Sequence, residues 1–190
     1  MRIITGSARG CRLKTPKGAA TTRPTADRVK ESLFNIIGAR TIDARVLDIF
    51  AGTGNLGLEA LSRGATKAVF IDKATRELIT FNTKTTKLAD KAEILAGDAF
   101  NELSRLAAAK EEFNLIFTDP PYHLGLWQKT LSYLDTTDLL ARSGVLIVEH
   151  SADENDLPPL TRLECVMNRR YGHTTQLSFF QWKDYLAEAD

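Results

Sequence analysis

Four consecutive residues, Asp119, Pro120, Pro121 and Tyr122, carry groups suited to a planar base that bears an exocyclic amine. The two prolines fix the backbone and remove two N–H donors, so the carbonyl groups of this segment can accept hydrogen bonds from a ligand. The lone pair of such an amine is delocalised into the ring, which makes the nitrogen a poor nucleophile. If the Asp119 carboxylate and the Pro120 carbonyl accept its two N–H groups, the lone pair becomes available, and Tyr122 can stack on the extruded base. The other interpretation is a rigid turn that ends a strand.

A glycine-rich turn lies between an apolar run at residues 45–49 and a helical pattern that starts at residue 56. Such a turn lets a ligand approach the backbone closely at the start of a helix. Its spacing, Gly52-x-Gly54-x-x-Gly57, also matches the dinucleotide fingerprint of NAD enzymes. However, the carboxylate of Asp48 would repel a diphosphate and attract a cation, which favours the sulfonium of S-adenosylmethionine. The cofactor contacts predicted here are Asp48, Phe50, Ala51, Gly52, Thr53 and Gly54.

Two further acidic residues follow predicted strands and fit an adenosine-type ligand. Asp72, which precedes Lys73, can accept two hydrogen bonds from a ribose diol, and this would serve NAD as well as S-adenosylmethionine. Asp98, followed by Ala99, is placed to meet the exocyclic amine of an adenine. It is equally suited to cap the helix that is predicted to begin at Phe100.

Strands and helices alternate from Arg45 onward, which predicts an α/β protein with a mainly parallel, doubly wound sheet. Such sheets bind ligands at the carboxyl ends of their strands, where the residues named above lie. The last two strand-like runs, 162–168 and 174–182, predict an antiparallel C-terminal hairpin with a turn at 169–173. The other predicted strands are 45–49, 68–72, 92–95, 114–118 and 144–149, and the predicted helices are 56–63, 75–88, 100–109 and 126–134.

The first 38 residues predict an extension that precedes the main domain at 39–190. Residues 2–5 and 11–14 suggest a small β-hairpin, and apolar residues at helical spacing suggest a helix that ends before Gly38. Residues 1–30 contain eight basic residues and one acidic residue, whereas the rest of the chain has a net charge of −6. A basic arm on an acidic body suggests nucleic acid as the partner, although a solvated basic face is the alternative. The predicted contacts are Arg9, Arg12, Lys14, Arg23 and Arg28.

The composition predicts one globular protein. The chain has 190 residues, of which 43% are hydrophobic and 26% are charged, and no apolar run is long enough to span a bilayer. The two cysteines, Cys11 and Cys165, have no paired spacing and are interpreted as reduced thiols of a cytoplasmic protein. The three histidines are scattered without metal-ligand spacing, so we expect no metal site. A monomer is the default expectation.

Several of these segments resemble known families. Residues 48–54 resemble the first motif of class I S-adenosylmethionine-dependent methyltransferases, and residues 119–122 resemble the motif of the branch that methylates amines. More narrowly, residues 22–35 and 56–65 and the opening Arg2-Ile3-Ile4-Thr5-Gly6 resemble the RsmD family. The resemblance implies a Rossmann-like methyltransferase fold. It also implies transfer of a methyl group to the exocyclic N2 of a guanine in small-subunit ribosomal RNA, either naked or in an assembling subunit.

Three alternatives stay open at this point. An adenine-N6 methyltransferase of DNA would also use Asp-Pro-Pro-Tyr, although the chain is short for a separate DNA-recognition domain. An NAD-dependent oxidoreductase would use the glycine fingerprint. A non-catalytic RNA-binding module would need only the basic arm.

Overall fold

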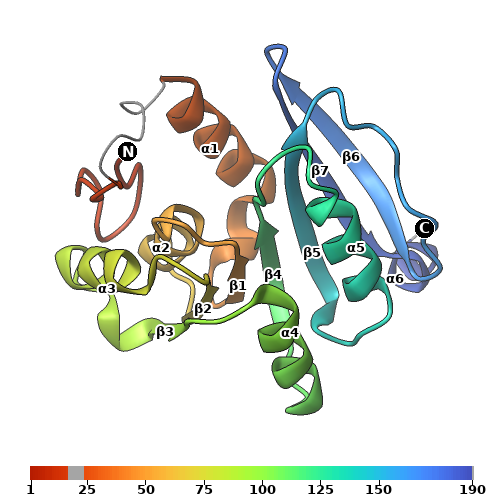
Figure 1. Ribbon diagram of the computed structural model, residues 1–190, viewed down its shortest axis with the longest axis horizontal. Helices are drawn as coiled ribbons and strands as arrows, with labels where there is room; N and C mark the ends of the chain where they lie inside the picture. Colours follow the sequence, from red (N-terminus) through yellow and green to blue (C-terminus); the bar gives the residue numbers. More distant parts are fainter. Residues whose placement is uncertain (17–23, 190) are drawn as a thin grey trace.

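The computed structural model describes residues 1–16 and 24–189, and it forms a seven-stranded sheet flanked by helices (Figure 1). Arg23, one of the predicted RNA contacts, lies outside the described residues. The strands are β1 Arg45–Ile49, β2 Lys67–Ile71, β3 Ala92–Leu95, β4 Phe113–Thr118, β5 Leu140–Ser151, β6 Leu163–Tyr171 and β7 Thr175–Trp182. The α-helices are α1 Pro24–Ile37, α2 Asn55–Ser62, α3 Arg76–Thr85, α4 Ala99–Ala108, α5 Leu126–Asp135 and α6 Lys183–Ala189, with 3₁₀ turns η1 Gly38–Thr41 and η2 Ala89–Lys91.

The strand order β3-β2-β1-β4-β5-β7-β6 confirms the predicted α/β fold. Strands β1 to β5 run parallel, and β7 pairs antiparallel with both β5 and β6. The chain proceeds outward from β1 in one direction to β3, then returns to β4 on the other side of β1. The carboxyl ends of β1 and β4 therefore flank the switch point at which open α/β sheets bind ligands.

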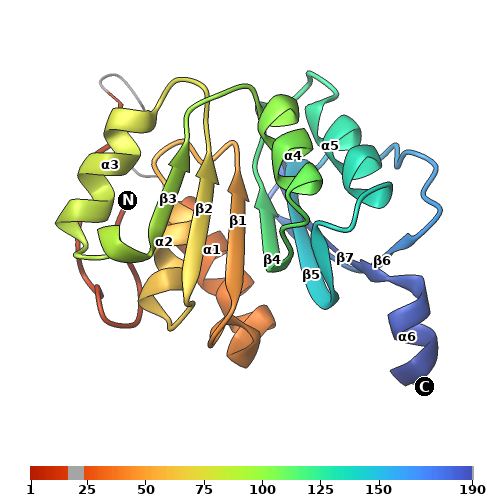
Figure 2. The same cartoon turned by 90° about the horizontal axis from the view of Figure 1, so that it is seen from below.

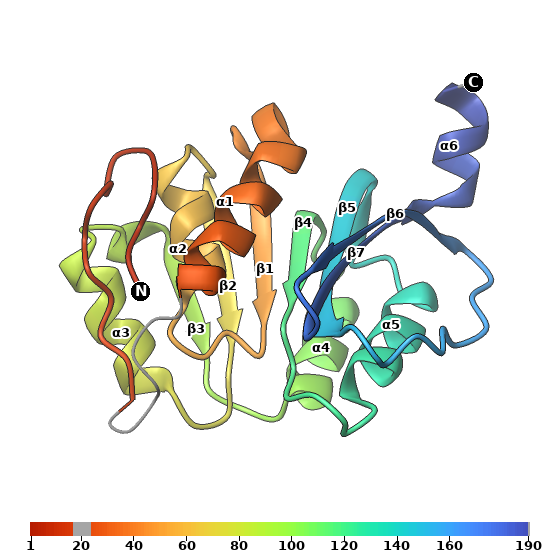
Figure 3. The ribbon, with the colours of Figure 1, turned by 90° about the horizontal axis from the view of Figure 1, so that it is seen from above.

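Helices cover both faces of the sheet, as Figures 2 and 3 show, with α1 and α2 on one face and α4 and α5 on the other. Each face has its own apolar core. Leu33 and Phe34 of α1 join Leu58 of α2 in the first core, and Leu103 of α4 joins Leu131 of α5 in the second. The β1 side chains alternate between these two cores, as those of a strand buried on both faces must.

The predicted N-terminal hairpin is present but short. The Ile3 N–H donates to the Cys11 carbonyl and the Leu13 N–H to the Met1 carbonyl, around a single antiparallel bridge from Arg2 to Arg12. One predicted detail of the C-terminal hairpin is wrong. The C-terminal turn begins at Gly172, because Arg169, Arg170 and Tyr171 continue β6 and pair with β7. The exposed arginines misled the prediction, since charged residues are also typical of an edge strand such as β6. The helix α6 was not predicted.

The N-terminal segment is held on α2 by hydrogen bonds with Ser62 and by the carboxylate of Glu59, which has no exposed surface. It accepts hydrogen bonds from the backbone N–H groups of Ile4 at 2.8 Å and Thr5 at 3.0 Å. It also pairs with Lys30 of α1 at 3.0 Å and with Arg63 at 2.8 Å. Lys30 is therefore a buried structural cation, and burial lowers its pKa despite the opposing effect of Glu59.

Apolar side chains of the same segment belong to the core of the main sheet. Ile3, Ala8 and Leu13 are buried in one cluster with Leu33 of α1 and Val46 of β1. The predicted division into an extension at 1–38 and a domain at 39–190 stays a prediction.

Glu59→Gln is expected to lower the free energy of unfolding by about 3 kcal/mol, because it leaves Lys30 buried beside a neutral amide. Urea unfolding followed by circular dichroism measures this loss. Glu93→Gln is the matched control, since Glu93 and its partner Lys67 are both more than 40% exposed. Its cost should stay below about 1 kcal/mol. Equal effects of the two substitutions would contradict the role assigned to Glu59.

Candidate active site

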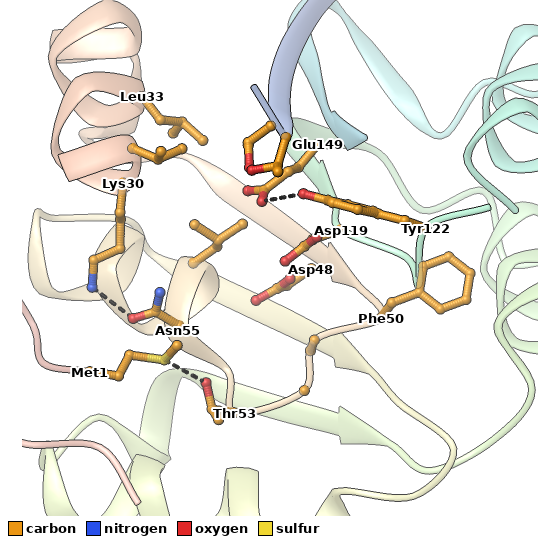
Figure 4. A pocket seen from close by; sticks show the side chains of 16 residues that line it. Met1, Lys30, Leu33, Asp48, Phe50, Thr53, Asn55, Asp119, Tyr122 and Glu149 are labelled. Carbon is orange, nitrogen blue, oxygen red and sulfur yellow. Dashed lines mark hydrogen bonds between the residues drawn. The ribbon is translucent and has the colours of Figure 1, made fainter. Parts of the chain in front are cut away.

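A cavity of about 650 Å³ opens at the carboxyl ends of β1, β4 and β5. Figure 4 shows that the glycine-rich turn and α1 contribute opposite parts of its wall. Val29, Lys30 and Leu33 of α1 contact the cavity, and Thr174 and Thr175 at the start of β7 close another side. Tyr171 at the end of β6 makes a hydrogen bond with Ser32 of α1. The hairpin β6–β7 and α1 therefore frame the cavity together.

The glycine-rich turn after β1 has a special backbone. Phe50 adopts a φ of 60°, which is rare for a residue with a side chain, and Gly52 and Gly54 have φ values of 55° and 77°. The Ala51 N–H donates to the Ile71 carbonyl at 3.0 Å, and the Gly54 N–H donates to the Ala51 carbonyl at 2.7 Å. These bonds hold the backbone of Ala51, Gly52 and Thr53 at the cavity wall, and the cofactor contacts predicted for them stay predictions.

The glycines of this turn have different tasks. A Cβ at Gly57 would lie 2.4 Å from the Phe70 ring, so this glycine lets α2 pack against β2. A Cβ at Gly52 would meet only the Phe50 carbonyl oxygen, at 3.9 Å. Gly52 therefore faces the cavity, where a ligand can approach the backbone. The close-packing role and the ligand role belong to separate residues.

Asp48, at the end of β1, lies at the bottom of the cavity and is 2% exposed. Its carboxylate accepts the Gly57 N–H in the first turn of α2 at 2.9 Å. Burial raises the pKa of Asp48 to about 7, Asp72 adds to the rise, and the hydrogen bond from Gly57 opposes it. The carboxylate therefore sits close to its titration point near neutral pH, and a cation beside it would favour its ionised form.

Asp119 and Glu149 stand side by side across the cavity from the glycine-rich turn. They follow the registered pair Thr118 and Val148 on the adjacent parallel strands β4 and β5. Figure 4 shows their carboxylates and that of Asp48 pointing into the cavity. Asp119 lines the cavity, and its side chain is exposed there. The protein around the carboxyl group, then Glu149, then Asp48 raise the pKa of Asp119.

Tyr122 joins this group through its hydroxyl, which donates a hydrogen bond of 3.0 Å to Glu149. Burial and the nearby Glu149 raise the pKa of Tyr122, so the phenol stays protonated and keeps donating. Burial also raises the pKa of Glu149, and the bond from Tyr122 opposes that rise. The aromatic ring of Tyr122 lines the cavity.

Sequence reasoning missed Glu149 as a functional candidate. A signal existed, because the fifth predicted strand ended at this residue and the ends of strands hold the ligands in this fold. It also missed Lys30 and Asn55, which bond to one another at 2.7 Å beside the cavity.

Other predicted site residues do not line this cavity. The Asp72 carboxylate accepts hydrogen bonds from the backbone of Gly52 at 2.9 Å, Ala74 at 2.8 Å and Thr75 at 2.9 Å. Asp98 caps α4 through the N–H groups of Phe100 and Asn101, as its alternative interpretation predicted. The ligand roles predicted for these two acids, and for Lys73 and Ala99, stay predictions. Pro120 is buried and Pro121 is exposed.

No group of three or more histidine, cysteine, aspartate or glutamate residues is arranged to hold a metal ion within residues 1–16 and 24–189. Across the same residues, no helix has both the length and the apolar character needed to cross a membrane.

The sheet with its antiparallel last pair, and the cavity at its switch point, define the Rossmann-like fold of the class I methyltransferases. The family model described as conserved hypothetical protein 95 matches residues 1–181. Ribosomal RNA small subunit methyltransferase D of Escherichia coli (strain K12) is 41% identical over 160 residues, which cover 83% of this chain and 78% of that protein. The chain belongs to this methyltransferase D family, as the resemblance predicted.

Two further relatives cover nearly the whole chain. YlbH of Bacillus subtilis (strain 168) is 40% identical over 178 residues, which are 92% of this chain and 95% of YlbH. The solved structure of yhhF from Escherichia coli is 36% identical and superposes with a TM-score of 0.81. That comparison covers 96% of this chain and 97% of the other.

Gly57→Ala is expected to lower the free energy of unfolding by about 1–3 kcal/mol, because the new methyl group meets the Phe70 ring. Phe70→Leu removes the obstructing ring, but it also lowers the free energy of unfolding because it leaves a cavity in the core. The double variant should therefore lose less than the sum of the two single losses, by at least about 0.5 kcal/mol. Chemical denaturation of all four proteins measures the difference, and strict additivity would show that the ring and the glycine do not interact.

Proposed function

We propose that this protein transfers a methyl group from S-adenosylmethionine to the exocyclic N2 amine of a guanine in small-subunit ribosomal RNA. The observation that carries the proposal is one cavity with Asp48 and the glycine-rich turn on one side and Asp119 and Tyr122 on the other. The names of relatives at 41% identity support methylation of ribosomal RNA. The guanine and its N2 position come from the resemblance of residues 22–35 and 56–65 to the RsmD family.

The residues around Asp48 fit S-adenosylmethionine in charge and in shape. This cofactor supplies a methyl group on a positively charged sulfur, and it has no phosphate for the buried carboxylate to repel. Asp48 would face its positive charge, and the backbone of Ala51, Gly52 and Thr53 would contact it closely. Asp72, Lys73, Asp98 and Ala99 are proposed to hold its adenosine part.

The opposite side of the cavity fits the amine. Asp119 and the Pro120 carbonyl would accept its two N–H groups, and Tyr122 would stack on the base. When the nitrogen forms its bond to the methyl carbon, it must lose a proton. The raised pKa of Asp119 makes its carboxylate a better proton acceptor than an aspartate with the ordinary pKa, so this residue is proposed to align the amine and to take that proton.

The basic N-terminal segment is proposed to bind RNA phosphates. Arg9, Arg12 and Lys14 are exposed, and so is Arg28 on the helix that contacts the cavity. Exposed cations on this segment and on α1 would orient the RNA without reading its sequence. Such binding weakens steeply as salt rises, because each phosphate contact releases counterions. Arg23 is proposed for the same role.

The test of the function is transfer of labelled methyl groups to small ribosomal subunits from cells that lack this enzyme. Label is expected at the N2 of one guanine, located by nuclease digestion and mass spectrometry. Asp119→Asn should lower kcat about 10²- to 10⁴-fold, because the amide neither carries a charge nor accepts the proton. Asp90→Asn, an exposed acid in η2, is the control and should leave kcat unchanged.

Four results would overturn the proposal. The first is label found in the adenines of duplex DNA instead of RNA. The second is calorimetric binding of NAD without binding of S-adenosylmethionine. The third is full activity of the Asp119→Asn protein, and the fourth is RNA binding by a wild-type protein that methylates no subunit or RNA.

Affinity for S-adenosylmethionine is expected to rise with pH as Asp48 ionises around pH 7. A cationic ligand binds the ionised carboxylate more tightly, so below pH 7 the affinity should fall by up to about tenfold per pH unit. Calorimetry between pH 5.5 and 7.5 measures this change. Asp48→Asn should bind more weakly and lose most of the pH dependence. A wild-type affinity that is constant over this range would contradict the role of Asp48.

A further inference from the structure

Glu149 is a carboxylate in the cavity for which the proposed methyl transfer has no task. Asp48 faces the cofactor side, and Asp119 faces the amine. Glu149 lies beside Asp119, because the two residues follow a registered pair on adjacent parallel strands. Neighbouring strands are only about 4.8 Å apart. A planar base whose amine reaches the carboxylate of Asp119 can therefore present the adjacent ring nitrogen to the carboxylate of Glu149.

The chemistry of the two oxygens of Glu149 differs. The Tyr122 hydroxyl donates to Oε1 at 3.0 Å. Among the residues that the structure describes, no hydrogen bond reaches Oε2. Burial raises the pKa of Glu149, and the donor on Oε1 opposes that rise because it favours the ionised carboxylate, which is an acceptor only. The cavity therefore offers an accepting group at the position next to Asp119.

The Watson–Crick edges of guanine and adenine present opposite groups to the accepting carboxylate of Glu149. Guanine presents the N1–H donor next to the N2 amine, so it offers adjacent donors to adjacent carboxylates. Adenine presents the N1 lone pair next to its N6 amine, which would face an accepting oxygen without a proton between them. A site built to pair with a donor rejects an analogue that lacks it, because its own polar group is left unpaired.

We propose that Glu149 selects guanine by accepting a hydrogen bond from its N1–H while Asp119 accepts from the N2 amine. This inference rests on the proposed function and names the residue that sets its base specificity. Asp-Pro-Pro-Tyr binds an amine, and Glu149 reads the atom beside that amine. The hydrogen bond to Tyr122 also fixes the direction of the Glu149 side chain.

The test replaces the target guanine by 2-aminopurine, which keeps the N2 amine but has a lone pair at N1. Small subunits are reconstituted with ribosomal RNA that carries either base at the mapped nucleotide. Wild-type kcat/KM should be on the order of 100-fold lower for 2-aminopurine. Glu149→Gln can donate its amide N–H to N1, so it should reduce the preference for guanine to less than about tenfold.

Two variants separate selection from a positioning role. Tyr122→Phe removes the hydrogen bond to Glu149 and should lower the rates with both bases while it keeps the preference for guanine. Glu149→Asp keeps the charge and should also retain the preference at a lower rate. Affinity for S-adenosylmethionine, measured by calorimetry, should change less than threefold in Glu149→Gln, which shows that the variant is folded and binds the cofactor.

The outcomes distinguish this inference from the proposed function. If wild-type protein methylates guanine N2 but accepts 2-aminopurine equally well, the inference is wrong and the function stands. The same holds if Glu149→Gln keeps the wild-type preference, or if Tyr122→Phe changes the preference as much as Glu149→Gln. Methylation of adenine by the wild-type protein would overturn both.

Discussion

The buried carboxylate of Glu59 holds together parts of the chain that the sheet alone does not connect. An ion pair in an apolar interior is costly unless each charge finds several partners. Glu59 has two backbone N–H groups and two cationic side chains, drawn from the N-terminal segment, α1 and α2. Because Lys30 also bonds to Asn55 and to the Arg2 carbonyl, the same network fixes α1 at the cavity wall. The helix that carries Arg28 is thus oriented from inside the core.

Three carboxylates in one cavity impose a second constraint. Asp48 contributes to the raised pKa of Asp119, and Glu149 contributes more. Each carboxylate therefore makes ionisation of its neighbour less favourable, and an entering positive charge relieves all of them. A cationic cofactor beside Asp48 would favour the ionised Asp119 on which the proposed binding of the amine depends. The cofactor side of the cavity, at Asp48, and the opposite side, at Asp119, are therefore coupled through the charges of their carboxylates.

The sequence predicted the parts of this structure that depend on local pattern. The five parallel strands and the Asp98 cap follow from apolar runs and from turn residues next to them. The N-terminal hairpin was less accurate, because the Ile4 and Thr5 N–H groups bond to Glu59, which is 55 and 54 residues away, respectively. Lys30 was counted in a basic arm, since no local pattern distinguishes a buried lysine from an exposed one. Burial depends on which distant carboxylate the fold brings to it.

The same reasoning explains why the motifs support the proposed transfer to an amine but do not choose the base. Asp119 and Tyr122 lie within four residues and fold as one segment, so their joint chemistry can be recognised in the sequence. Guanine and adenine both carry an amine that this segment can hold, and they differ at the adjacent ring nitrogen. The group that meets that nitrogen must come from the next strand of the sheet. Glu149 is 30 residues further along the chain, and only the pairing of β4 with β5 places it there.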